Sequence, residues 1–183
     1  MRRRFLMAIS LWGLATATSM AVSALGKPAE SRVGFQAIGP AGMRIEGTTA
    51  DLDVTSDGDH IVIQVPLSNL KTGIEVRDRH MRDKYLEVQK YPQAKLTVAR
   101  GDVKLPQAGE KASYDAQAVL DLHGQTKNVS VHYDLKGEAS GVVVDGKLHV
   151  NMKDVGIEVP SYLGVTVKPD VDVNAHFRIT PSS

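Results

Sequence analysis

Alternation of apolar and polar residues limits the possible folds of this protein more than any other feature of its sequence. Val129, Val131, Tyr133 and Leu135, for example, alternate with polar or charged residues. A period of two is typical of β-strands with one buried and one solvated face, which usually pair antiparallel. The pattern predicts eight strands, at residues 32–38, 43–54, 60–66, 95–104, 113–122, 127–137, 147–155 and 171–180.

Turn-forming residues separate these predicted strands. Asp57-Gly58 follows the second strand, and a segment with a glycine, residues 123–126, follows the fifth. Asp145-Gly146 predicts a two-residue hairpin, because both of its positions favour a positive φ. Residues 142–144 then either extend the sixth strand or form a short piece of their own. Eight strands at this spacing predict an all-β fold, either a sandwich or an up-and-down antiparallel barrel.

One charged segment, TGIEVRDRHMRDKYLEVQKYP at residues 72–92, interrupts the strand pattern. Its apolar residues recur at helical spacing, and no glycine or proline occurs between Ile74 and Tyr91. We predict one short helix at about 77–87, because the residue before Pro92 avoids the helical conformation. The apolar stripe of this helix is expected to lie against one end of the sheet.

The first 24 residues have the pattern of a secretory signal peptide. Arg2, Arg3 and Arg4 precede an apolar run at residues 5–17 and a small-residue cleavage site at Val22-Ser23-Ala24. The run is shorter than the roughly 20 residues of a membrane-spanning helix, so an uncleaved anchor is the less favoured alternative. We therefore expect residues 25–183 to form one periplasmic domain without a stable membrane anchor, with full secretion as the alternative.

Charge and cysteine content exclude two classes of protein. Without the three N-terminal arginines, 19 Lys and Arg stand against 21 Asp and Glu, a net charge of about −2. A nucleic-acid-binding protein needs a concentrated basic surface, so no nucleic-acid partner is predicted. The chain has no cysteine, which excludes a lipoprotein anchor and disulfides, so the core alone must stabilise the domain.

Slender side chains dominate the positions that should face the barrel interior. An eight-stranded barrel is at the size at which side chains either fill the interior or leave room for one ligand. Aromatic residues are few, so Val, Ile, Leu and Ala would supply most of the interior. A hollow barrel that holds a long apolar ligand and an ordinary filled core both remain open. The inward apolar candidates are Phe35, Ile45, Ile63, Leu96, Val98, Leu120, Val131, Tyr133, Leu148, Val150 and Phe177.

Arg77, Asp78 and His80 are the strongest polar candidates for contact with the head group of a ligand. They could instead pair locally or cap the helix, and we favour this structural role. His132 and His149 lie on polar strand faces, but they belong to no metal-binding spacing, so no metal is predicted.

Motifs of catalysis are weak in this sequence. No cysteine, Gly-x-Ser-x-Gly or glycine-rich phosphate loop occurs, so we predict neither catalysis nor a cofactor. An enzyme that acts on a bound lipid would have only His80 and Asp78 as candidate groups. Residues 159–169, with Tyr162 and Leu163, are expected to close one end of the barrel as a lid.

Three motifs resemble the YceI-like family of exported proteins over nearly all of the predicted mature chain. The first comprises Thr72-Gly73, Arg77-Asp78-Arg79-His80 and Tyr91-Pro92. The second is LDLHGQTKNVSV at 120–131, and the third is NMKDVGIEV at 151–159. The chain departs from the family pattern at Lys84-Tyr85-Leu86, at Asp121 and at Val155, where the family has Asp-Phe-Phe, threonine and an aromatic residue.

The resemblance implies an eight-stranded antiparallel lipocalin-like β-barrel that holds a long amphipathic lipid in its interior, and export to the periplasm. The ligand would be a long-chain isoprenoid or a related lipid, such as a quinone-like molecule or a fatty amide. We therefore expect a periplasmic lipid carrier, and we leave open whether it forms a homodimer. The alternative is a filled-core stress-response or interaction barrel without a small-molecule ligand.

Overall fold

The computed structural model of this protein describes residues 23–24, 28–162 and 165–180. The predicted signal peptide lies outside the described residues, apart from Ser23 and Ala24. These two residues form the short strand β1 (Ser23–Ala24), which pairs antiparallel with Ser56 and Thr55.

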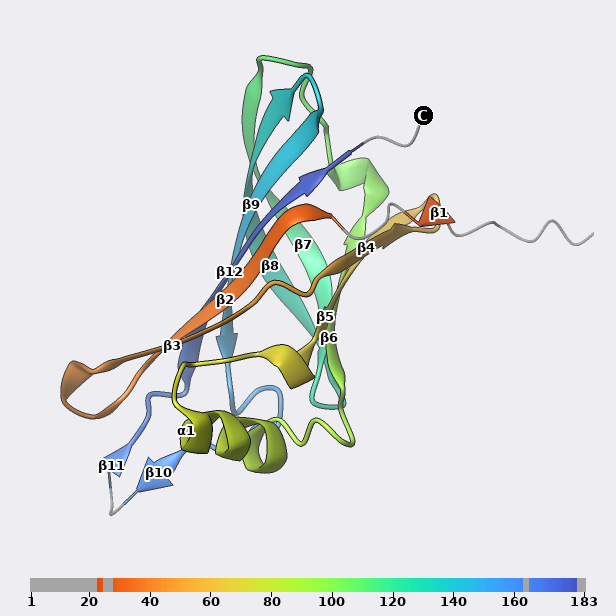
Figure 1. Ribbon diagram of the computed structural model, residues 1–183. Coiled ribbons are helices and arrows are strands. Elements are labelled where there is room, and N and C mark those ends of the chain that lie inside the picture. Colours follow the sequence, from red (N-terminus) through yellow and green to blue (C-terminus); the bar gives the residue numbers. More distant parts are fainter. Residues whose placement is uncertain (1–22, 25–27, 163–164, 181–183) are drawn as a thin grey trace, which may run out of the picture.

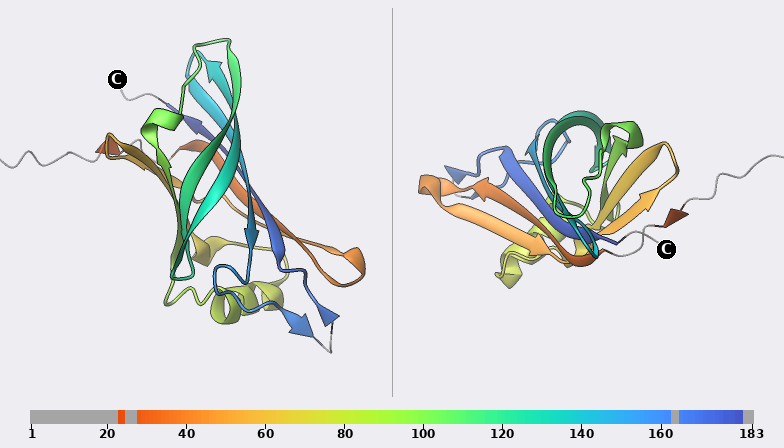
Figure 2. Two further views of the ribbon diagram at one scale, coloured as in Figure 1. Left: turned by 180° about the vertical axis from the view of Figure 1, so that it is seen from behind. Right: turned by 90° about the horizontal axis from the view of Figure 1, so that it is seen from above.

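One antiparallel sheet of ten strands curls into a half-barrel and forms most of the molecule (Figure 1; Figure 2). Its strands after β1 are β2 (Ala29–Ile38), β3 (Arg44–Thr49), β4 (Asp53–Ser56), β5 (His60–Pro66), β6 (Gln93–Ala99), β7 (Lys111–Leu122), β8 (Gln125–Glu138), β9 (Gly141–Asn151) and β12 (Asp170–Ile179). Their order across the sheet is β1-β4-β5-β6-β7-β8-β9-β12-β2-β3. A separate hairpin consists of β10 (Ser161–Tyr162) and β11 (Val165–Thr166). The predicted all-β antiparallel fold is confirmed.

The single strand predicted at residues 43–54 is in fact two strands, β3 at one end of the sheet order and β4 next to β1 at the other. β3 pairs with β2, and β4 pairs with β5. Between them, the amide of Asp51 donates a hydrogen bond to Thr49 Oγ1 at 3.1 Å, and Leu52 is buried. The two strands are therefore linked through residues 50–52 of the chain rather than through a ladder of hydrogen bonds.

The hairpin predicted at Asp145-Gly146 is wrong, because β9 runs through these residues without a break. Asp145 pairs with Asp134 on β8 and with His176 on β12. Neighbours on both sides thus hold this segment extended, and this pairing outweighs the local preference of Asp-Gly for a turn. The turn lies instead at residues 139–140, so residues 142–144 belong to β9.

Helix α1 (Glu75–His80) continues as a π-helical turn at Met81–Tyr85 (η3), close to the predicted helix at 77–87. Its end does not depend on Pro92. Glu87 takes a left-handed conformation with φ 44°, and the amide of Val88 donates to the carbonyl of Arg82 at 2.9 Å. In the described part of the chain, no helix is both long enough and apolar enough to cross a membrane.

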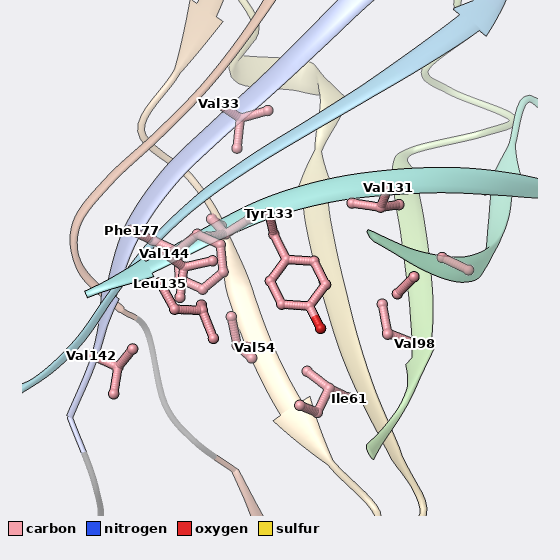
Figure 3. Packing of buried hydrophobic residues seen from close by; sticks show 13 residues of the cluster. Val33, Val54, Ile61, Val98, Val131, Tyr133, Leu135, Val142, Val144 and Phe177 are labelled. Carbon is pink, nitrogen blue, oxygen red and sulfur yellow. The ribbon is translucent and has the colours of Figure 1, made fainter. Parts of the chain in front are cut away.

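A packed core, which includes Leu135, Val142 and Val144 near the turn between β8 and β9 and no residue of α1, fills one end of the half-barrel. Figure 3 shows Tyr133 between Phe177 and Val98 in this core. The hydroxyl of Tyr133 donates to the carbonyl of Asp102 at 2.6 Å, and burial raises the pKa of this hydroxyl. The core cluster comprises Val33, Leu52, Val54, Ile61, Val98, Ala116, Ala118, Val131, Tyr133, Leu135, Val142, Val144 and Phe177.

Candidate ligand-binding cavity

An apolar cavity of about 620 Å³ lies at the other end of the half-barrel, beside α1. The inner faces of the strands form most of its wall. Val33 and Leu52 belong both to the wall and to the packed core. The core therefore forms the floor of the cavity.

The predicted inward residues divide between the cavity and the core. Those on the cavity wall are Phe35, Ile45, Ile63, Leu96, Leu120, Leu148 and Val150. Val98, Val131, Tyr133 and Phe177 belong instead to the packed core. The sequence left a hollow barrel and a filled barrel as alternatives. The structure is hollow at the end beside α1 and filled at the other end. Contact between any of these residues and a ligand stays a prediction.

Arg77 and His80 line the cavity from α1, but Asp78 lies off the wall. The buried carboxylate of Asp78 accepts hydrogen bonds from the backbone amide of Thr72, at 2.7 Å, and from the Thr72 hydroxyl. Arg77 donates from Nε to Thr72 Oγ1 at 2.8 Å and from Nη2 to the Thr72 carbonyl at 3.0 Å. Thr72 thus anchors both side chains and fixes the position of α1 at the cavity.

The charge state of Asp78 fits this anchoring role. Burial by itself raises the pKa of the carboxyl group, but the hydrogen bonds from Thr72 and the positive charges of Arg82 and Arg77 outweigh it. The net result is a pKa below the usual value for aspartate. Asp78 is therefore ionised at neutral pH, which makes its hydrogen bonds with Thr72 stronger than neutral ones.

The hairpin of β10 and β11 borders the cavity and belongs to the segment predicted as a lid. The amide of Lys168 donates to the carbonyl of Ile38 at 2.7 Å, which ties this segment to the end of β2. The side chain of Tyr162, and Leu163, lie outside the described part of the structure. Wall residues from this segment are Pro160, Ser161, Val165 and Val167.

Several wall residues are absent from the predicted inward set because they lie between strands. Leu67 and Leu70 belong to a 3-10 turn (η2, Leu67–Asn69) and its cap, and Ile74 and Val76 lie at the start of α1. None of them follows the period-two alternation that selected the other candidates. The helical spacing in residues 72–92 was the available signal, since it predicted an apolar stripe facing the sheet.

The histidines His132 and His149 lie exposed, beside carboxylates on neighbouring strands. His149 Nδ1 lies 2.9 Å from Asp172 and its Nε2 lies 3.3 Å from Asp170. The hydrogen bond with Asp172, and then that with Asp170, raise the pKa of His149 despite some burial. Among the residues that the structure describes, no group of three or more His, Cys, Asp or Glu side chains could hold a metal ion.

Solved structures with a similar fold include three proteins of low sequence identity. A polyisoprenoid-binding domain from Saccharophagus degradans matches with a TM-score of 0.69 and 20% identity, over 87% of this chain and 97% of that chain. BcnA from Burkholderia cenocepacia matches with a TM-score of 0.65 and 17% identity, over 81% of this chain and 95% of that chain. The YceI protein of Campylobacter jejuni matches with a TM-score of 0.51 and 13% identity, over 100% of both chains. At these identities the likeness shows the fold alone. A comparison with curated protein sequences finds no match.

A family model described as the YceI-like domain matches residues 26–179. The match extends from before β2 to the last residue of β12, so it includes α1, the cavity wall and the packed core. It also contains all three sequence motifs, at 72–92, 120–131 and 151–159. The chain belongs to the YceI-like domain family.

Proposed function

We propose that this protein binds one long-chain amphipathic lipid, a polyisoprenoid or a related quinone-like molecule or fatty amide, in the cavity beside α1. The observation that carries the proposal is a mainly apolar cavity of about 620 Å³ with a packed floor. Its volume falls within the range of about 300–1,000 Å³ that is usual for small-molecule sites. A solved domain of similar fold is described as polyisoprenoid-binding, which agrees with this ligand class.

The apolar tail would lie deep in the cavity and supply most of the affinity. Leu120 and Val150 on the wall belong to a second apolar cluster, which Tyr85 and Leu86 cover from the helix. Each methylene group that leaves water for such surroundings contributes about 0.8 kcal/mol. A long unbranched or isoprenoid chain therefore gains binding energy without many hydrogen bonds.

The head group would lie near Arg77 and His80, the cationic and titratable side chains that α1 brings to the wall. Two nitrogens of Arg77 are held by Thr72, so the guanidinium has a defined orientation. In the described part of the chain, no hydrogen bond is formed by its Nη1. This nitrogen is a suitable donor to an oxygen of the head group.

The proposal is one of binding rather than catalysis. The titratable side chains on the described wall are Arg77, His80 and Tyr85. Asp78, the other candidate for chemistry on a bound lipid, is engaged with Thr72. We further infer a periplasmic carrier, because the first 24 residues have the pattern of a signal peptide.

Native mass spectrometry of the protein purified without detergent tests the lipid proposal. We expect either a co-purified lipid or uptake of one long-chain polyprenol per chain from detergent micelles. Ile63→Trp should prevent uptake, because Ile63 lies on the cavity wall. Val119→Trp is the matched control, since Val119 is exposed outside the cavity. A ligand-free mass together with no polyprenol uptake would contradict the proposal and support an interaction barrel without a small-molecule ligand.

A further inference from the structure

The open end of the cavity carries most of the exposed large apolar side chains. Ile74, Val76 and Val165 line the cavity and yet are 53%, 53% and 48% exposed. Met43 is 54% exposed and lies two residues from Ile45 of the cavity wall. We call these four residues, Met43, Ile74, Val76 and Val165, the mouth rim. Elsewhere in the described residues, only Leu105 and Val119 are large, apolar and exposed.

The mouth rim is assembled from three segments that are far apart in the sequence. Met43 precedes β3, Ile74 and Val76 lie at the start of α1, and Val165 begins β11. Figure 1 and the left view of Figure 2 place the β2–β3 hairpin, α1 and the β10–β11 hairpin at the same end of the molecule. Isolated apolar side chains on a protein surface need no explanation, but a group around an apolar opening indicates an interaction surface.

Exposed basic side chains flank the mouth rim. Arg44 follows Met43, and Lys71 and Arg79 lie on either side of Ile74 and Val76 in the sequence. The segments 39–46, 71–85 and 158–168 together carry seven basic and five acidic side chains, whereas the predicted mature chain has a net negative charge. This end of the protein is therefore complementary to an anionic lipid surface, which attracts lysine and arginine.

We propose that the mouth rim docks on the surface of an anionic lipid bilayer, so that a lipid chain passes between bilayer and cavity without crossing water. The proposal rests on the proposed function, because a cavity for a long apolar chain needs a route from a bilayer. Burial of the rim side chains in the headgroup region would attach the protein, and the flanking cations would orient it with the opening towards the lipid. The attachment is reversible, since few apolar side chains take part.

Flotation of the protein with lipid vesicles tests the docking. The vesicles consist of phosphatidylcholine alone or of equal parts of phosphatidylcholine and phosphatidylglycerol. We expect flotation with the mixed vesicles, and weaker flotation at high salt because salt screens the attraction. The double variant Ile74→Ser with Val76→Ser should reduce partition onto the mixed vesicles by about tenfold or more. The control, Leu105→Ser with Val119→Ser, removes two exposed apolar side chains elsewhere, 46% and 36% exposed, and should leave partition unchanged.

Two charge-reversal variants test whether the basic side chains beside the mouth rim orient the protein on the bilayer. Arg79→Glu should weaken flotation with the mixed vesicles by several-fold. Lys111→Glu makes the same charge change at an exposed position of β7, away from the rim, and should have a much smaller effect. Equal effects of the two variants would show that only net charge matters, which would overturn a defined docking surface. Thermal unfolding of each variant checks that the fold is unchanged.

Uptake of a long-chain polyprenol from detergent micelles separates failure of docking from failure of the lipid proposal. Uptake from micelles without flotation would overturn the docking and leave the lipid proposal standing. Flotation without uptake from either source would contradict the lipid proposal and leave the docking standing. In a further outcome, the rim variants leave flotation unchanged and instead convert a dimer to a monomer in solution. That result would overturn docking and show that the rim is a contact between two copies of the chain.

Discussion

The phenyl ring of Phe35 lies over the backbone of Gly47, its partner across the β2–β3 pair. A Cβ atom at position 47 would overlap the ring. Phe35 is also part of the cavity wall. Because Gly47 has no side chain, the ring of Phe35, the largest apolar wall residue of β2, can occupy the space above it. The shape of the cavity therefore depends on this glycine.

The first prediction concerns Gly47→Ala. The new methyl group must displace the ring of Phe35, so we expect the free energy of unfolding to fall by about 1–3 kcal/mol. Gly146→Ala is the matched control, because a Cβ there would only approach the carbonyl of Ala175 at 4.0 Å. Urea unfolding of the two variants measures the difference. Equal stabilities would show that the ring moves aside at little cost.

The second prediction concerns the anchor between Asp78 and Thr72. Asp78→Asn keeps the size of the side chain but replaces an ionised acceptor. We therefore expect the free energy of unfolding to fall by about 1–3 kcal/mol at neutral pH. Asp83→Asn removes an exposed charge from the same helical segment and should stay within about 0.5 kcal/mol of the parent. If both variants unfold at the parent's urea midpoint, Asp78 does not anchor α1.

The third prediction is the pH dependence of the same anchor. The pKa of Asp78 is lower in the folded protein than in the unfolded chain. Its stabilisation is therefore fully present above the unfolded pKa of about 3.9, and it is lost as the pH falls through the lower folded pKa. The difference in unfolding free energy between the parent and Asp78→Asn should shrink on going from neutral pH to acid. A difference that grows in acid would contradict this sign.

The fourth prediction has the opposite sign and concerns His149. Its hydrogen bonds with Asp172 and Asp170 raise its pKa in the folded protein. The stabilisation is thus present below the unfolded pKa of about 6.5 and is lost as the pH rises through the folded pKa. Because these side chains are exposed, we expect the pairing to contribute less than about 1 kcal/mol to the free energy of unfolding. NMR titration should show a lower pKa for His149 after Asp172→Asn, and no change would rule out this pairing.

The fifth prediction compares the two ends of the half-barrel. Val131→Trp adds bulk to the packed core and should cost about 1–3 kcal/mol of unfolding free energy. Ile63→Trp adds bulk where the wall faces open space, so its cost should be clearly smaller. Thermal and urea unfolding of both variants provide the measurement. A larger loss for Ile63→Trp than for Val131→Trp would mean that the cavity is not open in solution.

Pairing partners explain where the sequence-based predictions of strands succeeded and failed. The strand at 60–66 was predicted with the bounds that the structure has, because it pairs with β6 along its whole length. Residues 43–54 read as one strand, since the alternation does not show that the partner changes from β2 to β5. The turn at Asp145-Gly146 was predicted from local preference, whereas β8 and β12 hold these residues extended.

The sequence by itself determined the antiparallel all-β fold, the family and the inner face of most strands. These properties are local, because successive side chains on a strand point to opposite faces and the pattern can be read residue by residue. Tertiary structure alone decided that Tyr133 and Phe177 fill one end while Leu96 and Leu148 line a cavity at the other. The curvature of the sheet and the packing of α1 against it set the distance between facing walls, and that distance depends on residues far apart in the chain.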